Sequence, residues 1–216
     1  MYQRTSRAGI LSLVGGLALA MSSLAVRADF EADYKAGVES FSRGDVVSAM
    51  TTLKKAVESG HAPSQWLYGY ILDGTDEDAE AVEYYRKAAV QNHPPAQFSL
   101  GAAYLSGEGV KQNPEEGHKW IRLAAENGHG AAINQMALFS MRDAAAGKQD
   151  NDTALRWIRA AAEGDFIPAM EAMAQAYRTG GYGLQQDDKL AAQWDAKVLK
   201  VKGLDTKTRK RKGAAK

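Results

Sequence analysis

The residues best suited to chemistry in this sequence are its four histidines, because neutral imidazole is a common metal ligand and a general base. Three of them recur at similar intervals, each directly after a segment of helical pattern, and this equivalent placement favours a structural role in a turn: His61, His93 and His129. The fourth, His118, has no second histidine at the spacing of a His-Glu-x-x-His zinc motif. The sequence therefore predicts no metal site.

The acidic runs and glycine pairs are also better explained by structure than by catalysis. Asp76-Glu77-Asp78 and Glu115-Glu116 fall where helices are predicted to start, and negative charge there complements the helix dipole. Gly107-Glu108-Gly109 could suggest a phosphate-binding loop, but it follows no predicted strand and a similar motif returns at 181–183, which favours a turn between helices. The sequence also has no cysteine, Gly-x-Ser-x-Gly elbow, Ser-x-x-Lys or Walker-type loop. We therefore expect no catalytic residues and no cofactor, and we expect that the protein is not an enzyme.

Residues 1–28 have the three-part layout of a secretory signal peptide. Arg4 and Arg7 precede an uncharged stretch that is rich in Leu, Ala and Gly, and Val26-Arg27-Ala28 resembles a cleavage site. We predict cleavage after Ala28 and a periplasmic or secreted mature protein. The alternative is a retained membrane anchor, because the uncharged stretch is long enough to span a bilayer, but its glycines and serines dilute the hydrophobicity.

Charge divides the rest of the chain into an acidic body and a basic tail. Residues 29–196 contain 25 Asp and Glu against 15 Lys and Arg, whereas residues 197–216 contain nine Lys and Arg and one acid. We expect residues 203–216 to form a basic, disordered tail, whose central cations are Lys207, Arg209, Lys210, Arg211 and Lys212. Behind a signal peptide such a tail would not meet nucleic acid. It would be a plain solvated terminus, or it would contact an anionic membrane surface or an acidic partner.

A repeat of about 36 residues organises the body of the chain, and its clearest copy spans residues 96–130. Small and apolar residues at helical spacing predict a first helix, helix A, and the Gly-x-Gly motif predicts the turn after it. Asn113-Pro114 predicts the start of helix B, with Asn113 as its N-cap and Glu116 able to bond back to the amide of that cap. Helix B has Trp120, Ala124 and Ala125 on its packing face and ends at Asn127-Gly128.

The aromatic residue of helix B sets the period, with intervals of 36, 37 and 37 residues between Tyr84, Trp120, Trp157 and Trp194. The copy at 62–94 lacks the Gly-x-Gly loop, the copy at 131–166 has residues 142–147 in its place, and residues 30–60 form a degenerate earlier unit. One helix pair cannot bury its apolar face alone. The copies therefore predict an all-α fold, an α/α solenoid of about five stacked helix pairs over residues 29–202.

The pattern Leu-Gly-x-x-Tyr, then Gly-x-Gly-Val, then Trp followed by Ala-Ala and Gly resembles the Sel1-like repeat, a relative of the tetratricopeptide repeat. The resemblance covers about residues 30–202, and only the copy at 96–130 matches the pattern throughout. It implies a solenoid that acts as a scaffold or adaptor in protein complexes, in a family that includes exported bacterial proteins.

A binding surface is predicted on the helix A positions that lie outside the packing pattern. The sites two residues before and two after the leucine of the Leu-Gly pair, or its equivalent in the other copies, share one face, about 200° from that residue. We call them the A-helix stripe: Trp66, Tyr70, Phe98, Ala102, Asn134, Leu138, Glu171 and Gln175. Because Trp and Tyr are frequent interface anchors, we expect the stripe to line a concave groove; alternatively, these residues fill gaps between repeats.

These observations favour a periplasmic scaffold that binds a protein or peptide partner, with no nucleic acid and no small-molecule cofactor. A second hypothesis is an envelope-associated regulatory protein that is held at the membrane by its tail or by an uncleaved N-terminus. The third is a cell-wall-active hydrolase, which would need acids or histidines converging in a deep pocket.

Overall fold

The computed structural model describes residues 29–204, and within this range the chain is helical without any β-strand. Residues 29–42 form the first helix. The elements that follow are α2 (Val46–Glu58), α3 (Ala62–Asp73), α4 (Asp78–Ala89), α5 (Pro94–Ser106), α6 (Pro114–Glu126), α7 (Gly130–Ala145), α8 (Asn151–Glu163), α9 (Ile167–Thr179), the 3-10 turn η1 (Gly181–Gly183) and α10 (Asp188–Val201). The prediction of an all-α repeat fold is confirmed.

Two of the predicted segments lie outside the described residues: the signal peptide at 1–28 and the tail cations at 207–212. Within residues 29–204, no helix combines the length and the apolar character that crossing a membrane requires.

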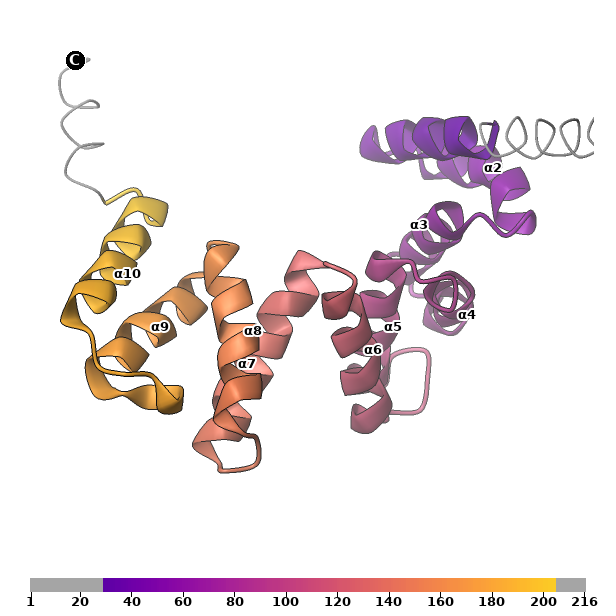
Figure 1. Ribbon diagram of the computed structural model, residues 1–216. Coiled ribbons are helices and arrows are strands. Elements are labelled where there is room, and N and C mark those ends of the chain that lie inside the picture. The colour runs from indigo at the N-terminus through magenta and orange to yellow at the C-terminus, as the bar shows by residue number, and fades with distance from the viewer. Residues whose placement is uncertain (1–28, 205–216) are drawn as a thin grey trace, which may run out of the picture. The chain divides into compact units, whose positions relative to one another are not determined.

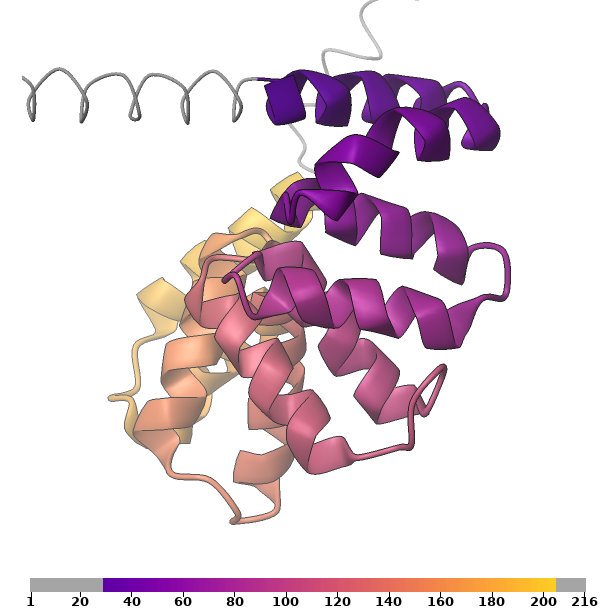
Figure 2. The ribbon, with the colours of Figure 1, turned by 90° about the vertical axis from the view of Figure 1, so that its right-hand side faces the viewer.

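The described helices form two compact units, and each is described by itself. Unit 1 covers residues 29–91 and contains the first helix and α2 to α4, and unit 2 covers residues 92–204 and contains α5 to α10. In unit 1, α3 packs against α4; in unit 2 the pairs are α5 with α6, α7 with α8, and α9 with α10 (Figures 1 and 2). Neighbouring pairs of unit 2 meet through α6 with α7 and α8 with α9. Each predicted A and B helix is thus one arm of a hairpin.

The degenerate unit at the start of the chain is also a helix pair. A Cβ atom on Gly37 would lie 2.6 Å from the side chain of Leu53 in α2, so the first helix and α2 are in close contact at this glycine. Tyr34 and Phe41 of the first helix pack against the buried cluster around Leu53. With this pair, the described chain has the five helix pairs that the repeats predict.

The hairpin of α5 and α6 shows how local residues set the turn. Helix α5 ends at Gly107, whose φ of 88° is the left-handed conformation that glycine adopts without strain. The Asn113 side chain accepts a hydrogen bond from the Glu116 amide at 3.2 Å, which confirms the predicted N-cap. The reciprocal bond is not formed, because the Asn113 amide donates to the Tyr104 carbonyl at 2.8 Å and the Glu116 carboxylate pairs with Lys119.

The two copies that lack a Gly-x-Gly loop turn differently. After α3, Asp76 has a φ of 63°, and Asp is among the few residues other than glycine that enter this region readily. After α7, the chain reverses at Gly147, which has a φ of 67°. The interpretation of residues 142–147 as the loop was wrong for residues 142–145, which form the last turn of α7. Alanines at 144 and 145 favour helix, so α7 continues until a glycine permits the reversal.

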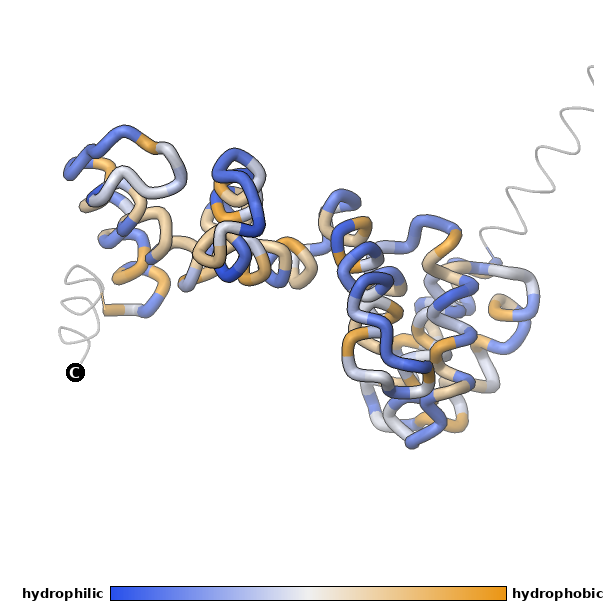
Figure 3. The backbone as a smooth tube through the Cα atoms, turned by 90° about the horizontal axis from the view of Figure 1, so that it is seen from below, coloured by the Kyte–Doolittle hydropathy of each residue, from blue (hydrophilic) through white to orange (hydrophobic). Residues whose placement is uncertain are grey.

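Small residues bring helix A and helix B close together, as predicted. A Cβ atom on Gly101 of α5 would lie 2.7 Å from the Ile121 side chain and 3.0 Å from the Gly117 carbonyl oxygen of α6. Apolar and hydrophilic residues are interleaved along the helices of both units (Figure 3). The core therefore lies between the helices of each hairpin and, within each unit, between neighbouring hairpins.

The packing face of helix B is centred one residue later than the period suggested. Trp157 is buried, with 6% of its surface exposed, whereas the equivalent Tyr84, Trp120 and Trp194 are half-buried. The residues that follow the ring are buried in three of the repeats: Tyr85, Ile121 and Ile158. The alanine pairs Ala88-Ala89, Ala124-Ala125 and Ala161-Ala162 are buried as predicted.

Cations lie over three of these four rings. The Lys87 ammonium is 4.6 Å from the ring centroid of Tyr84, the Arg156 guanidinium 4.5 Å from that of Trp157 and the Lys197 ammonium 3.9 Å from that of Trp194. Such cation–π contacts are favourable and leave the charge in water. The rings of Tyr84, Trp157 and Trp194 therefore contact the core on one side and a solvated cation on the other.

Candidate partner-binding surface

The unit 1 part of the A-helix stripe is an aromatic cluster. Trp66 and Tyr70 lie one turn apart on α3, with ring centroids separated by 5.8 Å. Phe41, from the first helix, meets the Tyr70 ring edge-on at 5.9 Å. Tyr70 is 47% exposed, while Trp66 and Phe41 are half-buried. We call Phe41, Trp66 and Tyr70 the aromatic cluster. It presents aromatic ring surface to solvent, and the contacts among the three rings fix their orientations.

The position of these rings on α3 leaves them at the edge of the core. Leu67 and Ile71 are buried in the unit 1 core, and Trp66 and Tyr70 each precede one of them by one residue, about 100° around the helix, so Trp66 packs against the core and Tyr70 reaches solvent. Phe41 was not predicted from the sequence, because the degenerate copy at residues 30–60 has lost the repeat pattern. Its spacing of seven residues from Tyr34, which is two helical turns, was the available signal.

In unit 2 the first stripe residue fills a gap between repeats. The Phe98 ring of α5 lies 4.9 Å from the ring of His129, which starts α7, and it packs against the unit 2 core. Farther along, Asn134 is half-buried and Leu138 is 41% exposed on α7. Phe98 thus fits the alternative interpretation, in which stripe residues fill gaps between repeats, whereas Leu138 is available at the surface.

The last part of the stripe, on α9, is polar and tied to α10. The Lys202 ammonium lies 2.7 Å from the Glu171 carboxylate, and Arg178 of α9 pairs with Asp195 of α10. Gln175 is exposed. The stripe therefore changes from aromatic on α3 to charged and amide side chains on α9. The continuous concave groove stays a prediction.

Two of the histidines at the repeat boundaries cap the A helices. The Nδ1 atom of His93 accepts from the Ala96 amide at 3.4 Å, and Nδ1 of His129 accepts from the Ala132 amide at 3.3 Å. Partial burial lowers the pKa of His129, which favours the neutral ring that this acceptor role needs. In the last repeat Phe166 occupies the same position, without a side-chain cap. The turn role predicted for these residues is what the structure shows.

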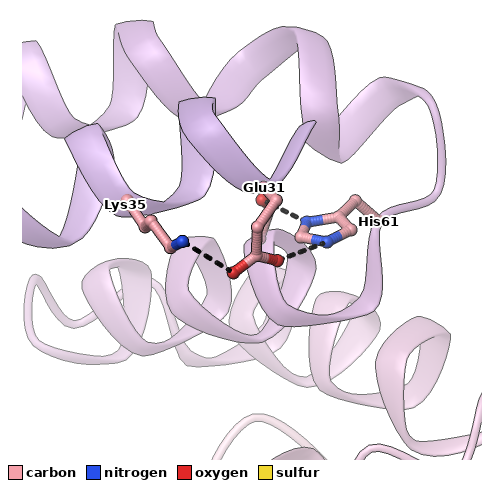
Figure 4. Close-up of polar contacts among 4 residues, drawn as sticks. Glu31, Lys35 and His61 are labelled. Atoms are coloured by element: carbon pink, nitrogen blue, oxygen red, sulfur yellow. Dashed lines mark hydrogen bonds and ion pairs between the residues drawn. The ribbon is translucent and has the colours of Figure 1, made fainter. Parts of the chain in front are cut away.

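His61 occupies the cap position of α3 and also contacts the first helix (Figure 4). Its Nδ1 atom lies 2.8 Å from the Ser64 hydroxyl, and its Nε2 atom lies 3.7 Å from the Glu31 carboxylate, which is 3.9 Å from the Lys35 ammonium. Burial lowers the pKa of His61, and the charge of Glu31 partly opposes this effect. A cavity of about 530 Å³ opens beside these residues. It contains a single acid that already faces two basic groups, so it does not assemble a pair of catalytic carboxylates.

His118 packs between α6 and α7, where its ring meets Phe139 edge-on at 4.3 Å. Burial lowers its pKa, and the neighbouring Arg142 adds to the effect. Within residues 29–204, no group of three or more acids and histidines is placed to hold a metal ion.

Comparison with protein families matches the Sel1 repeat at residues 62–93, 94–129, 130–166 and 167–194. Each of these ranges begins with an A helix, at α3, α5, α7 and α9, and extends into the B helix that follows. Together the four copies cover more than half of the chain.

Among curated proteins, an F-box protein of Arabidopsis thaliana is 31% identical over 96 residues, which is 44% of this chain and 27% of that protein. An exopolysaccharide production negative regulator of Rhizobium leguminosarum is 24% identical over 160 residues, covering 49% of this chain and 59% of the regulator. A chitin synthase regulator of Malassezia restricta is 39% identical over 83 residues, 35% of this chain and 6% of that protein. The chain thus spans less than two thirds of each of these relatives.

Solved structures show the same fold. A Sel1 repeat protein from Oxalobacter formigenes superimposes with a TM-score of 0.65 at 24% identity, over 82% of this chain and 75% of that one. A protective antigen of uropathogenic Escherichia coli strains gives a TM-score of 0.67 at 25% identity, over 82% of this chain and 39% of that one.

Proposed function

Because the chain belongs to the Sel1 repeat family, we propose that it is a periplasmic scaffold that binds a protein or peptide through the A-helix stripe. Sel1 repeat folds commonly serve protein–protein interaction and regulation, and they are typically scaffolds without catalytic activity. The signal-peptide pattern of residues 1–28 supports the periplasmic location. The concave arrangement of the stripe is part of the proposal.

The aromatic cluster is the observation that supports this binding mode most directly. Exposed aromatic groups are expensive to leave in water, and Trp and Tyr are enriched among the residues that dominate binding energy. The cluster is also ordered before any partner arrives, since Trp66 and Phe41 contact Tyr70 on two sides. A partner would therefore lose little side-chain entropy on docking here.

Site-specific crosslinking tests the binding surface. A photoreactive residue replaces Tyr70 or, in unit 2, Leu138, and the control position is Val47 of α2, which is 78% exposed but outside the stripe. We expect a discrete crosslinked species in the native cells from positions 70 and 138, and none from position 47. The same species from all three positions would mean that contact is not specific to the stripe.

Fractionation and N-terminal sequencing test the location. We expect the chain in the periplasmic extract, with a mature N-terminus at Asp29. An intact N-terminus in the membrane fraction would contradict export with cleavage.

A regulatory role at the envelope is the second proposal, and the relatives named as regulators favour it. Membrane attachment through the tail should be lost in high salt, since screening weakens contacts between exposed charges. Attachment through an uncleaved N-terminus should persist in high salt.

A further inference from the structure

A second aromatic surface lies on the α3–α4 hairpin of unit 1, apart from the A-helix stripe. The rings of Tyr68 and Tyr84 are 5.0 Å apart, and both side chains are half-buried. Tyr68 lies midway between Trp66 and Tyr70 in the sequence, and a step of two residues turns a helix by about 200°. Tyr68 therefore stands on the opposite side of α3 from the aromatic cluster.

Negative charge surrounds this ring pair. Glu80 and Tyr84 are one turn apart on α4, Glu77 precedes the same helix, and Glu58 is the last residue of α2. Partial burial raises the pKa of Tyr68, and the charges of Glu80, Glu77 and Glu58 raise it further, so these carboxylates lie within electrostatic reach of its ring. Within residues 29–204, none of the three carboxylates takes part in an ion pair. We call Glu58, Tyr68, Glu77, Glu80 and Tyr84 the tyrosine patch.

The patch already receives one cation from its own helix. Lys87 is exposed, and its ammonium group lies 4.6 Å from the Tyr84 ring centroid. Aromatic faces attract cations, and nearby carboxylates add to that attraction. Lys87 shows that the Tyr84 ring can receive a lysine ammonium group, and the same attraction would apply to an arginine. An incoming basic segment would compete with Lys87 for the ring.

We propose that the tyrosine patch binds the basic C-terminal segment of a second copy of this chain, Lys207-Thr-Arg-Lys-Arg-Lys212. Charge complementarity supports this occupant, because residues 29–196 have a large excess of acids and the segment has five cations and no acid. Arginine can stack on tyrosine while its donors reach carboxylates, and lysine adds charge. The association uses a different surface from the A-helix stripe, so its success or failure is separate from that of the proposed function.

Direct binding of the segment is measured with a fluorescent peptide of residues 205–216. The receptor is the exported full chain in which Lys207, Arg209, Lys210, Arg211 and Lys212 are all replaced by Gln, so that its own tail cannot compete. We expect saturable binding at low salt that weakens as salt is added. Sedimentation of the unsubstituted chain should show concentration-dependent self-association that the five Gln substitutions abolish.

Paired variants place the binding site. Glu77→Gln with Glu80→Gln should weaken peptide binding about two- to fivefold per charge, the usual range for exposed ion pairs. Lys87→Ala should strengthen it by a similar factor, because it removes a competing cation, and loss of folding cannot produce a gain of affinity. Lys197→Ala is the matched control, since Lys197 has the same relation to Trp194 in the last repeat, and it should leave the affinity unchanged.

Three results would overturn the proposal. The first is a chain that stays monomeric and does not bind the peptide. The second is binding that is insensitive to the Glu77 and Glu80 substitutions, or that responds equally to Lys87→Ala and Lys197→Ala. The third is a peptide that binds vesicles containing phosphatidylglycerol but not the protein, which would assign the segment to the membrane surface instead.

Discussion

Replacing Trp157 with alanine tests how the ring of helix B supports the fold. Trp157 belongs to the buried cluster of unit 2, in which α6, α7, α8 and α9 meet, and only 6% of its surface is exposed. An alanine there leaves a cavity that the surrounding helices can fill only in part. The change should therefore destabilise unit 2 strongly.

The size of the effect follows from the buried area. A buried tryptophan removes about 150–250 Å² from water, and at about 25 cal/mol per Å² this gives roughly 4–6 kcal/mol. Alanine recovers part of this area, so the expected cost is about 3–5 kcal/mol, as for other Trp→Ala changes in cores. Losing the contact with the exposed Arg156 adds about 0.5–1 kcal/mol at most. Trp120→Ala should cost about half as much as Trp157→Ala, because Trp120 is half-buried.

Urea unfolding followed by circular dichroism at 222 nm is the assay, because removing a tryptophan changes the fluorescence signal itself. Repeat proteins can unfold in steps, so both the midpoint and the number of transitions are compared with the unsubstituted chain. We expect Trp157→Ala to lower the midpoint more than Trp120→Ala. If the two variants unfold at the same midpoint, burial does not determine the role of these rings and the argument fails.

Three further predictions use the same assay. Gly101→Ala should cost about 1–3 kcal/mol, since its Cβ would lie 2.7 Å from Ile121, and an unchanged midpoint would mean that α5 and α6 can separate freely. Asn113→Ala should cost about 0.5–2 kcal/mol through loss of the α6 cap, and Asn113→Asp should restore most of the stability. Because burial lowers the pKa of His129, the folded state favours the neutral ring, so stability should hold above about pH 6.5 and fall as the pH drops through the lowered pKa. His129→Asn retains an acceptor for the helix cap and should reduce this loss between pH 7.5 and 5, and an unchanged pH profile would assign the effect to other groups.

The features that the sequence predicted well depend on a few adjacent residues. Asn113-Pro114 marks the start of α6 and Gly107 the end of α5, because capping and positive φ are decided within one turn of helix. The same local rule predicted a bond from the Asn113 amide to the Glu116 side chain. That bond is not formed, because the amide donates to the Tyr104 carbonyl instead. Local rules identify the possible partners of a backbone group but not the partner that the tertiary fold supplies.

The period of the repeat predicts that helix B packs against its neighbouring helices, but it does not predict which side of helix B is buried most deeply. Adjacent residues on a helix differ by about 100° in direction, so Trp120 and Ile121 both fall near the packing face. Ile121 is buried and Trp120 half-buried because Gly101 and Gly117 bring α5 against Ile121. That choice depends on the neighbouring helix, and a single-helix pattern does not contain it.

Equivalent positions that differ between repeats are where partner recognition can reside, since the positions that repeat faithfully serve the core. The alanine pairs of helix B are buried in three copies, whereas the stripe position of Tyr70 is Ala102 in the next repeat and Leu138 in the one after. On α3, Tyr68 and Tyr70 stand on opposite sides of one helix, the first beside Tyr84 and the second beside Phe41. If the two surfaces act independently, Tyr70→Ala should reduce crosslinking from a photoreactive residue at position 138 and leave binding of the 205–216 peptide intact. Tyr68→Phe keeps the ring and should leave both functions unchanged. A loss of both functions in Tyr70→Ala would instead show that α3 recognises one partner with both of its sides.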